Sequence, residues 1–219
     1  SGVPDSMLLV TTKPLEAISL TNAAIRDKAT KIIAVGGDGT INEVASALVG
    51  SNIPLGIIPI GSGNGLARHL QIPLTPSKAL AHALLNKTKR IDVGFINERP
   101  FFCTAGIGFD AQVAHQFAKN NKRGLINYIK ATFITLYKFK PIVIHFEGKQ
   151  EILFSFTIAN ANQFGNNAYI SPFSNIQDGN SVSYASGNLR GVIILEKGYD
   201  EIRGEAWVKV GISKKTMSA

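Results

Sequence analysis

The chain has 219 residues and a net charge of +8, with 45% hydrophobic and 17% charged residues. This composition excludes intrinsic disorder and is typical of a globular protein with one large domain or two small ones. The single cysteine, Cys103, excludes an internal disulfide and favours a reducing compartment. No apolar run approaches the roughly 20 residues of a membrane span, the N-terminus lacks a signal-peptide pattern, and the four histidines lack zinc-ligand spacing.

The first part of the chain alternates between expected strands and expected helices. Strands are expected over 7–11, 31–35 and 54–60, and helices over 15–28, 42–49, 65–70 and 77–85. Strands that alternate with helices predict a parallel sheet whose faces are covered by helices.

From about residue 90 the pattern changes to short strands. These are expected over 91–96, 100–104, 142–146, 151–159, 192–195, 201–203 and 208–212, with one helix over 124–138. This second part is therefore expected to be mainly antiparallel. We place a domain boundary near residues 89–92, with one domain over 1–90 and another over 91–219. Whether the last strand returns to the first domain stays open.

A glycine loop, Gly36-Gly37-Asp38-Gly39-Thr40, joins the expected strand 31–35 to the next helix. A helix N-terminus favours anions, and glycines let a phosphate approach the backbone closely. A carboxylate within such a loop is a poor ligand for a bare phosphate, but it can bind a magnesium ion or a hydroxyl group. The loop therefore predicts a nucleotide site with its metal.

A second glycine loop, Gly61-Ser62-Gly63-Asn64-Gly65, follows the expected strand 54–60. Two such loops at the carboxyl ends of neighbouring parallel strands would line one crevice. Ser62 and Asn64 could bind a phosphate or ribose by hydrogen bonds, and Arg68 could pair with a phosphate. Neither loop is a Walker A motif or a dinucleotide fingerprint.

Purely structural interpretations compete with these binding roles. Thr40 and Glu43 have the spacing of a capping box, and Asn64 could cap the following helix. Each glycine could serve only a turn. Asp38 has no comparably simple structural role.

Residues 33–44 and 59–68 together resemble the motifs of the diacylglycerol kinase catalytic family, which includes bacterial lipid kinases, sphingosine kinases and ceramide kinases. NAD kinases and phosphofructokinases share the first loop, whereas the second motif is what points to lipid kinases. Residues 106–110 also resemble the segment where the family's second domain begins. The resemblance covers about residues 8–178.

The resemblance implies an N-terminal three-layer α/β nucleotide-binding domain, a C-terminal β-sandwich domain and a cleft between them. It implies transfer of the γ-phosphate of ATP to a lipid hydroxyl with Mg2+, and diacylglycerol is the leading acceptor. Asp38 resembles the acid that works with catalytic magnesium or orients the acceptor. The positions that match the nucleotide site are Thr11, Gly36, Gly37, Asp38, Gly39, Thr40, Asn42, Glu43, Gly61, Ser62, Gly63, Asn64 and Arg68.

The resemblance also implies a structural metal near residues 171–180. Asp178 matches its main carboxylate ligand, Asn175 stands where relatives often carry an acid, and Asn180 would offer its carbonyl. An Asp-Gly turn is an equally good interpretation of Asp178. Oxygen ligands of this kind suit magnesium or calcium.

Three departures from the family pattern leave questions open. Relatives carry a late Asp-Gly-Glu that supplies the general base, and here Glu205 aligns with its glutamate but Arg203 replaces the aspartate. Glu205 is the expected catalytic base, and whether the base is intact is open. The N-terminus and residues 180–190 also diverge, which suggests that this sequence omits segments of a longer protein. An intact mass well above 23.5 kDa would support that hypothesis.

The expected helix 124–138 combines an apolar stripe with basic neighbours. We expect Ile129, Phe133 and Tyr137 to pack on the β domain, because their spacing is typical of a core-facing stripe. The basic edge would steer the protein to an anionic membrane. The basic residues are Lys119, Lys122, Arg123, Lys130, Lys138 and Lys140.

We expect a lipid substrate at the membrane surface as the partner and a cytoplasmic, peripherally membrane-associated location. No nucleic-acid partner is expected, since no recognition motif accompanies the positive charge. A homodimer is one option for the oligomeric state. Two other functions stay open, namely an NAD-kinase-like nucleotide kinase and a nucleotide- or lipid-binding protein without turnover.

Overall fold

The computed structural model describes residues 6–85, 87–119, 125–146, 149–179, 182–188, 191–195, 202–204, 207–208 and 210–218. Two parallel strands, β1 (Ile32–Gly36) and β2 (Leu55–Pro59), form the centre of its N-terminal part. Four helices accompany them: α1 (Glu16–Arg26), α2 (Asp38–Leu48), α3 (Gly65–His69) and α4 (Pro76–Leu84). The predicted alternation of strands and helices is thus confirmed from β1 onward.

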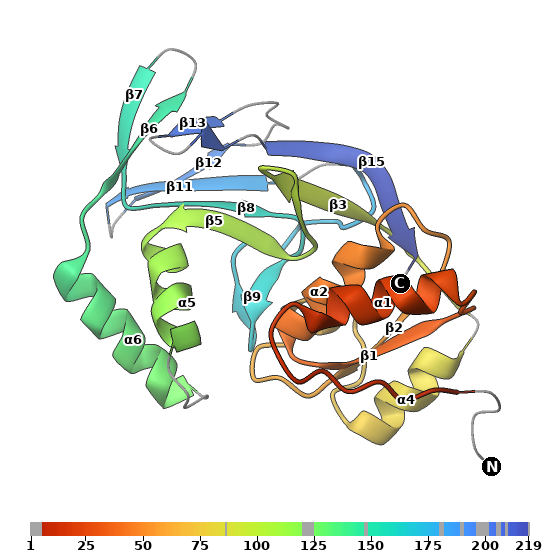
Figure 1. Cartoon of the computed structure of the whole chain (residues 1–219). Helices are drawn as coiled ribbons and strands as arrows, with labels where there is room; N and C mark the ends of the chain where they lie inside the picture. The colour runs from red at the N-terminus through yellow and green to blue at the C-terminus, as the bar shows by residue number, and fades with distance from the viewer. Residues whose placement is uncertain are drawn as a thin grey trace.

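Helices cover both faces of the parallel pair (Figure 1). On one face, Ala34 and Ile57 belong to the same buried cluster as Leu48 of α2. On the other face, a Cβ added at Gly56 would lie 2.8 Å from the Cβ of Ala83 in α4. The described residues of this part therefore form a helix–sheet–helix arrangement.

Residues 7–11, which we predicted to form a strand, have no regular secondary structure. Met7, Leu8 and Val10 are all exposed, and no strand among the described residues pairs with this segment. An extended segment becomes a stable strand only when a neighbour satisfies its backbone N–H and C=O groups. The strand prediction is therefore wrong for the structure described.

After residue 90, the strand pairs that the structure describes are all antiparallel. One sheet contains β3 (Arg90–Ile96), β4 (Arg99–Phe101) and β15 (Val210–Ser218). A second contains β5 (Thr104–Gly108), β8 (Ser155–Ala159), β11 (Val182–Asn188) and β12 (Gly191–Leu195). A third contains β6 (Ile142–Phe146), β7 (Lys149–Leu153), β13 (Ile202–Gly204) and β14 (Trp207–Val208). A short hairpin is formed by β9 (Gln163–Gly165) and β10 (Ala168–Tyr169).

Two helices, α5 (Phe109–Lys119) and α6 (Leu125–Lys138), lie between β5 and β6. Only the second was predicted. The strand predicted over 151–159 is divided into β7 and β8 at Phe154. The ring of Phe154 lies 4.5 Å from that of Phe109 and 4.8 Å from that of Phe139, measured between centroids. This aromatic cluster anchors the chain where the two strands separate.

The surface of α6 differs from our expectation. Ile129, Phe133 and Tyr137 are 45%, 68% and 91% exposed, whereas Ala131 and Thr135 are buried. The helix packs against α5, and its small residues face inward. The prediction that the large apolar stripe packs on the β domain is therefore wrong, because small side chains allow the closer approach between helices.

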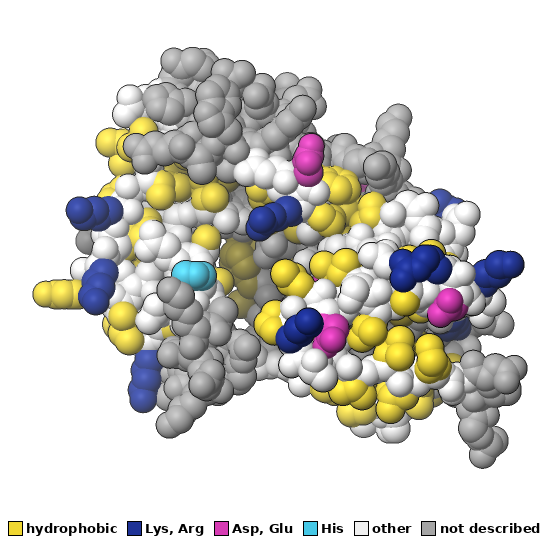
Figure 2. All heavy atoms as spheres, viewed as in Figure 1, with side chains coloured by type: hydrophobic (Ala, Val, Ile, Leu, Met, Phe, Trp, Pro, Cys, Tyr) yellow, Lys and Arg dark blue, Asp and Glu magenta, His cyan; other side chains and the backbone are white. Residues whose placement is uncertain are grey.

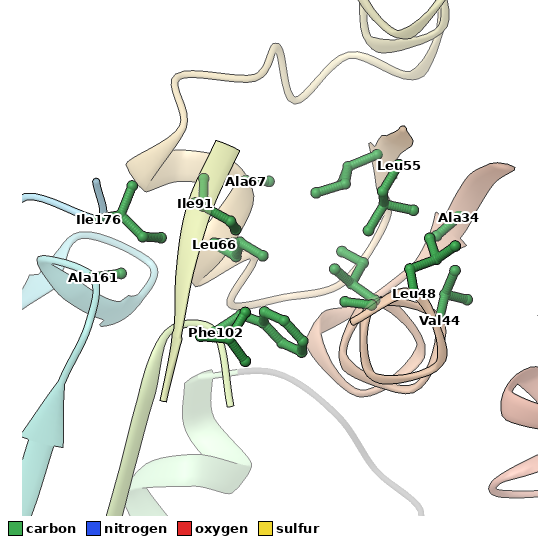
Figure 3. Close-up of a cluster of buried hydrophobic side chains, with 14 of the residues drawn as sticks. Ala34, Val44, Leu48, Leu55, Leu66, Ala67, Ile91, Phe102, Ala161 and Ile176 are labelled. Atoms are coloured by element: carbon green, nitrogen blue, oxygen red, sulfur yellow. The ribbon is translucent and has the colours of Figure 1, made fainter. Parts of the chain in front are cut away.

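Buried side chains from both parts of the chain meet in one cluster (Figure 3). Figure 3 shows residues of α2 and the parallel strands on one side, residues of α3, β3 and the segment after β8 on the other, and Phe102 between them. A second cluster joins β4, β6, β7 and β8 through Phe101, Ile144, Leu153, Phe156 and Ile158. The first cluster contains side chains from both sides of residue 90, so it does not separate two domains there. The domain boundary and the β-sandwich stay predictions.

Within the described residues, none of the helices has both the length and the apolar character that a membrane crossing needs.

Candidate functional site

The two glycine loops meet at the carboxyl ends of β1 and β2. The Ile60 backbone N–H donates to the Gly36 carbonyl at 3.0 Å. A Cβ added at Gly61 would lie only 2.6 Å from the Cα of Gly37, so the loops touch backbone to backbone. Only glycine permits this approach. The prediction that both loops share one edge of the sheet is confirmed.

Asp38 joins the two loops through its carboxylate. The Asn64 N–H donates to Asp38 Oδ2 at 2.8 Å, and the Gly65 N–H donates to Asp38 Oδ1 at 2.7 Å. Asp38 lies in the first turn of α2. Its carboxylate therefore connects the start of α2 to the N–H groups at the start of α3. The sequence suggested no structural role for this acid, and the structure supplies one. A carboxylate has about four lone-pair sites, so two remain for another ligand.

Asn64 and Arg68 are bound within the protein. The Gly61 N–H donates to Asn64 Oδ1 at 3.0 Å, and Asn64 Nδ2 donates to the Gly61 carbonyl at 2.7 Å. Asn64 is buried and does not cap α3 with its side chain. Arg68 Nε donates to the Gly63 carbonyl at 3.0 Å, and its Nη1 donates to Asn167 Oδ1 at 3.1 Å. These groups hold the second loop in shape, and their contact with a nucleotide stays a prediction.

Glu43 does not form the capping box that we considered. Its Oε1 accepts a hydrogen bond from the Leu15 N–H at 3.1 Å, and its Oε2 accepts one from the Ala17 N–H at 3.3 Å. The helix begins at Asp38, so Thr40 is already inside α2 and packs against Gly36 instead. Glu43 therefore stabilises the start of α1, which is 26 residues or more away in sequence.

The remaining positions that we predicted to bind the nucleotide are more open. Ser62 and Asn42 are exposed, and a Cβ added at Gly39 would meet no atom within 4 Å. Thr11 lies in the exposed segment before α1. These groups are accessible to a ligand in the described structure.

The β9–β10 hairpin covers the second loop, which the sequence did not indicate. The Asn166 N–H donates to the Gly63 carbonyl at 2.8 Å. A Cβ added at Gly165, which has φ +121°, would lie 2.9 Å from the Cα of Gly63. The loop is thus held between Asp38 on one side and the hairpin on the other. The Gly-Asn-Asn turn at 165–167, with positive φ at all three residues, was the available signal.

Cys103 contacts the β9–β10 hairpin that covers the second loop. Its Sγ donates to the Gln163 carbonyl at 3.0 Å. Burial raises the pKa of the Cys103 thiol to about 12, and the negative charge of Asp38 adds to the effect. The thiol therefore stays protonated at neutral pH.

We expect Cys103 to react with iodoacetamide at pH 8.5 at least about 100-fold more slowly in the native protein than in urea, because the thiolate is the nucleophile. Since the pKa is raised on folding, the unfolded chain loses this proton first. Stability should therefore fall as the pH rises above the ordinary thiol pKa of 9.0. Timed alkylation followed by mass spectrometry measures the ratio, and equal rates would contradict the buried, protonated thiol.

The structure describes two of the three predicted metal ligands, Asn175 and Asp178. Asn175 Oδ1 accepts a hydrogen bond from the Gln177 N–H at 3.1 Å, and Asp178 is exposed. The Gly179 N–H instead donates to Asp92 Oδ2 at 2.7 Å. No group of three His, Cys, Asp or Glu side chains suited to a metal ion occurs in the described part of the chain. Asn180 and Glu205 lie outside the described residues, so the structural metal and the catalytic base stay predictions.

The structure has two glycine loops at one edge of a parallel α/β sheet, and antiparallel sheets follow in the chain. Comparison with known sequences identifies a class of protein for the first of these parts. Residues 5–96 match the family model of the diacylglycerol kinase catalytic domain. This match places residues 5–96 in the diacylglycerol kinase catalytic-domain family.

Individual relatives carry related names. The chain is 31% identical over 176 residues to a diacylglycerol kinase of Mycobacterium tuberculosis (strain ATCC 25618 / H37Rv), covering 75% of this chain and 57% of the relative. It is 30% identical over 184 residues to a protein of Klebsiella pneumoniae (strain 342) named "Probable lipid kinase YegS-like", covering 80% of this chain and 62% of the relative. The chain thus spans less than two thirds of the length of either protein.

Solved structures share the fold. A crystal structure of a diacylglycerol kinase from Bacillus anthracis str. Sterne superposes with a TM-score of 0.66 at 18% identity, covering 95% of this chain and 84% of that one. A candidate diacylglycerol kinase from the same organism gives a TM-score of 0.73 at 19% identity, covering 94% and 82%. These matches support a mixed α/β fold with several sheets, as predicted.

Proposed function

We propose that this chain is the catalytic part of an ATP- and Mg2+-dependent lipid kinase. The reaction is attack of a lipid hydroxyl on the γ-phosphate of ATP, with diacylglycerol as the leading acceptor and phosphatidic acid as the product. Membership of the diacylglycerol kinase catalytic-domain family supports the lipid-kinase activity. The acceptor, the nucleotide and the metal are our own assignment.

The observation that carries this proposal is the open position at Gly39. It is the second residue of α2, an 11-residue helix, and nothing lies within 4 Å of the place where its Cβ would be. The fold therefore does not need glycine here, and glycine weakens a helix relative to alanine. A phosphate that approaches the helix N-terminus would need it, because a Cβ would stand in its way.

The rest of the site suits phosphoryl transfer, which depends on positioning and on neutralising charge. The exposed hydroxyl of Ser62 belongs to the loop that touches Gly37 through Gly61. Asp38 would hold magnesium through the lone pairs that Asn64 and Gly65 do not use. When bound, magnesium would neutralise the charge on the phosphate oxygens. Glu205 would act as the base that accepts the proton of the lipid hydroxyl.

The test is transfer of labelled γ-phosphate from ATP to diacylglycerol in mixed micelles that contain magnesium. Label in phosphatidic acid would support the proposal, and ceramide and sphingosine would test other lipid acceptors. Label in NAD would favour the NAD-kinase-like alternative. ATP binding without transfer to any of these acceptors would favour a binding protein without turnover. We consider this alternative because Arg203 replaces the aspartate that relatives carry before the glycine.

Gly39→Ala separates the ligand role of this position from its structural role. We expect the free energy of unfolding to rise by about 0.5–1 kcal/mol, because alanine is the better helix former and has room. ATP binding should weaken by about tenfold or more through loss of a phosphate contact. Urea unfolding and calorimetric titration with ATP measure the two effects. Unchanged ATP affinity would contradict the proposed phosphate position.

A further inference from the structure

One face of α6 combines exposed apolar side chains with exposed lysines. Ile129, Phe133, Leu136 and Tyr137 are exposed and follow the spacing of a single helical stripe. Lys130 and Lys138 within the helix, and Lys140 just after it, are also exposed. We call these seven residues the α6 face. Figure 2 shows hydrophobic and basic side chains next to one another over the region where Figure 1 draws α6.

The surrounding segment is unusually basic. Residues 111–146 contain six Lys and Arg and no Asp or Glu, so all 15 acids of the chain lie elsewhere, beside the other 17 Lys and Arg. The positive charge of the protein is therefore concentrated in the sequence segment that contains α5 and α6. Charge of this kind attracts an anionic surface over a distance of about one Debye length.

We propose that the α6 face docks on an anionic lipid bilayer. Phe133 and Tyr137 enter the boundary between headgroups and acyl chains, and the lysines lie among the anionic headgroups. This inference rests on the proposed function, because a lipid acceptor resides in such a bilayer.

Charge and shape favour a bilayer over other occupants of this surface. A second copy of the chain would bring lysines against lysines, which costs free energy without compensating acids. A nucleic-acid duplex would pair its phosphates with the lysines and leave the side chains of Phe133 and Tyr137 without an apolar partner. An anionic bilayer offers both an apolar interior and negative charge.

The test measures co-sedimentation of the protein with phosphatidylcholine vesicles, with and without phosphatidylglycerol, in the absence of ATP. The wild type should bind the anionic vesicles, and the double variant Phe133→Ser/Tyr137→Ser should bind at least about tenfold more weakly. The matched control is Leu80→Ser/Leu84→Ser. These leucines are 38% and 41% exposed on α4, which likewise buries small residues against its neighbour. The control should bind as the wild type does.

A charge variant tests the second half of the proposal. Lys130→Glu/Lys138→Glu should weaken binding to the anionic vesicles by about tenfold or more at low salt, and rising salt should reduce wild-type binding toward the same level. Circular dichroism melting of each variant checks that it is folded. We expect all three variants to fold, because the six substituted positions are exposed.

Specific outcomes would overturn the docking proposal. These are absence of wild-type binding, equal binding by wild type and the Phe133/Tyr137 variant, or equal loss in the α4 control. A dimer in sedimentation velocity that the Phe133/Tyr137 variant abolishes would replace the bilayer with a second copy. Because the vesicle assay contains no ATP, its result does not depend on phosphoryl transfer. A protein that binds vesicles but phosphorylates no lipid would leave the docking supported and the proposed kinase activity wrong.

Discussion

Replacing Asp38 with alanine is expected to lower the free energy of unfolding by about 2–4 kcal/mol. The change removes both acceptors of the Asn64 and Gly65 N–H groups, and both of these residues are buried. Buried donors that lose their partner cannot regain it from water at no cost. Urea unfolding followed by circular dichroism measures the difference.

Asp38→Asn and Asn42→Ala are the informative companions of this variant. The asparagine keeps one acceptor oxygen but turns an NH2 group toward an N–H donor, so it should also destabilise the protein. Asn42 is an exposed neighbour in the same helix, and its alanine variant should change stability by less than about 0.5 kcal/mol. If Asp38→Ala is as stable as the wild type yet inactive, the acid acts only in chemistry and the joining of the loops contributes nothing measurable.

This prediction changes how a loss of activity would be interpreted. Asp38→Ala should lower the proposed phosphoryl transfer even if the carboxylate never touches substrate or metal, because the second loop loses two hydrogen bonds to α2. Inactivity of this variant alone therefore does not identify a catalytic residue. Stability and ATP affinity have to be measured beside turnover.

Gly61→Ala is expected to lower the free energy of unfolding by about 1–3 kcal/mol or more, the range for overpacking at a tight contact. The new Cβ would lie 2.6 Å from the Cα of Gly37 and 2.9 Å from Asn64 Oδ1. One of these is a backbone atom and the other belongs to a buried, doubly hydrogen-bonded side chain, so neither can move away easily.

The loops of Gly61→Ala should also separate, so that ATP binding weakens together with stability. Gly39→Ala is the matched control for stability, since the same added methyl group meets open space there. It should leave the protein as stable as the wild type or more so. Thermal melting with and without ATP compares the two variants. A melting temperature of Gly61→Ala equal to that of the wild type would show that the loops do not need this contact.

Local sequence patterns predicted the regular elements of the N-terminal part well. The glycine loops after residues 35 and 60 were found because a buried strand, a glycine cluster and a helical period follow one another within a few residues. Periodicity failed at residues 7–11, where a strand-like composition had no neighbouring strand, and at α5, which was left unassigned. Whether a segment pairs or packs is decided by partners that lie far away in sequence.

The sequence by itself determined the family, the two loops and the candidate residues within them, because these depend on residue types at short spacing. Only the tertiary structure decided what those residues contact. Asp38 binds N–H groups 26 and 27 residues away, Glu43 stabilises the start of α1, and Arg68 reaches Asn167 across 99 residues. The exposure of α6 was decided in the same way, because a helical stripe does not reveal which of its faces a neighbouring helix will cover. Hydrogen bonds and packing between distant segments arise only when the chain has folded, and no local pattern encodes them.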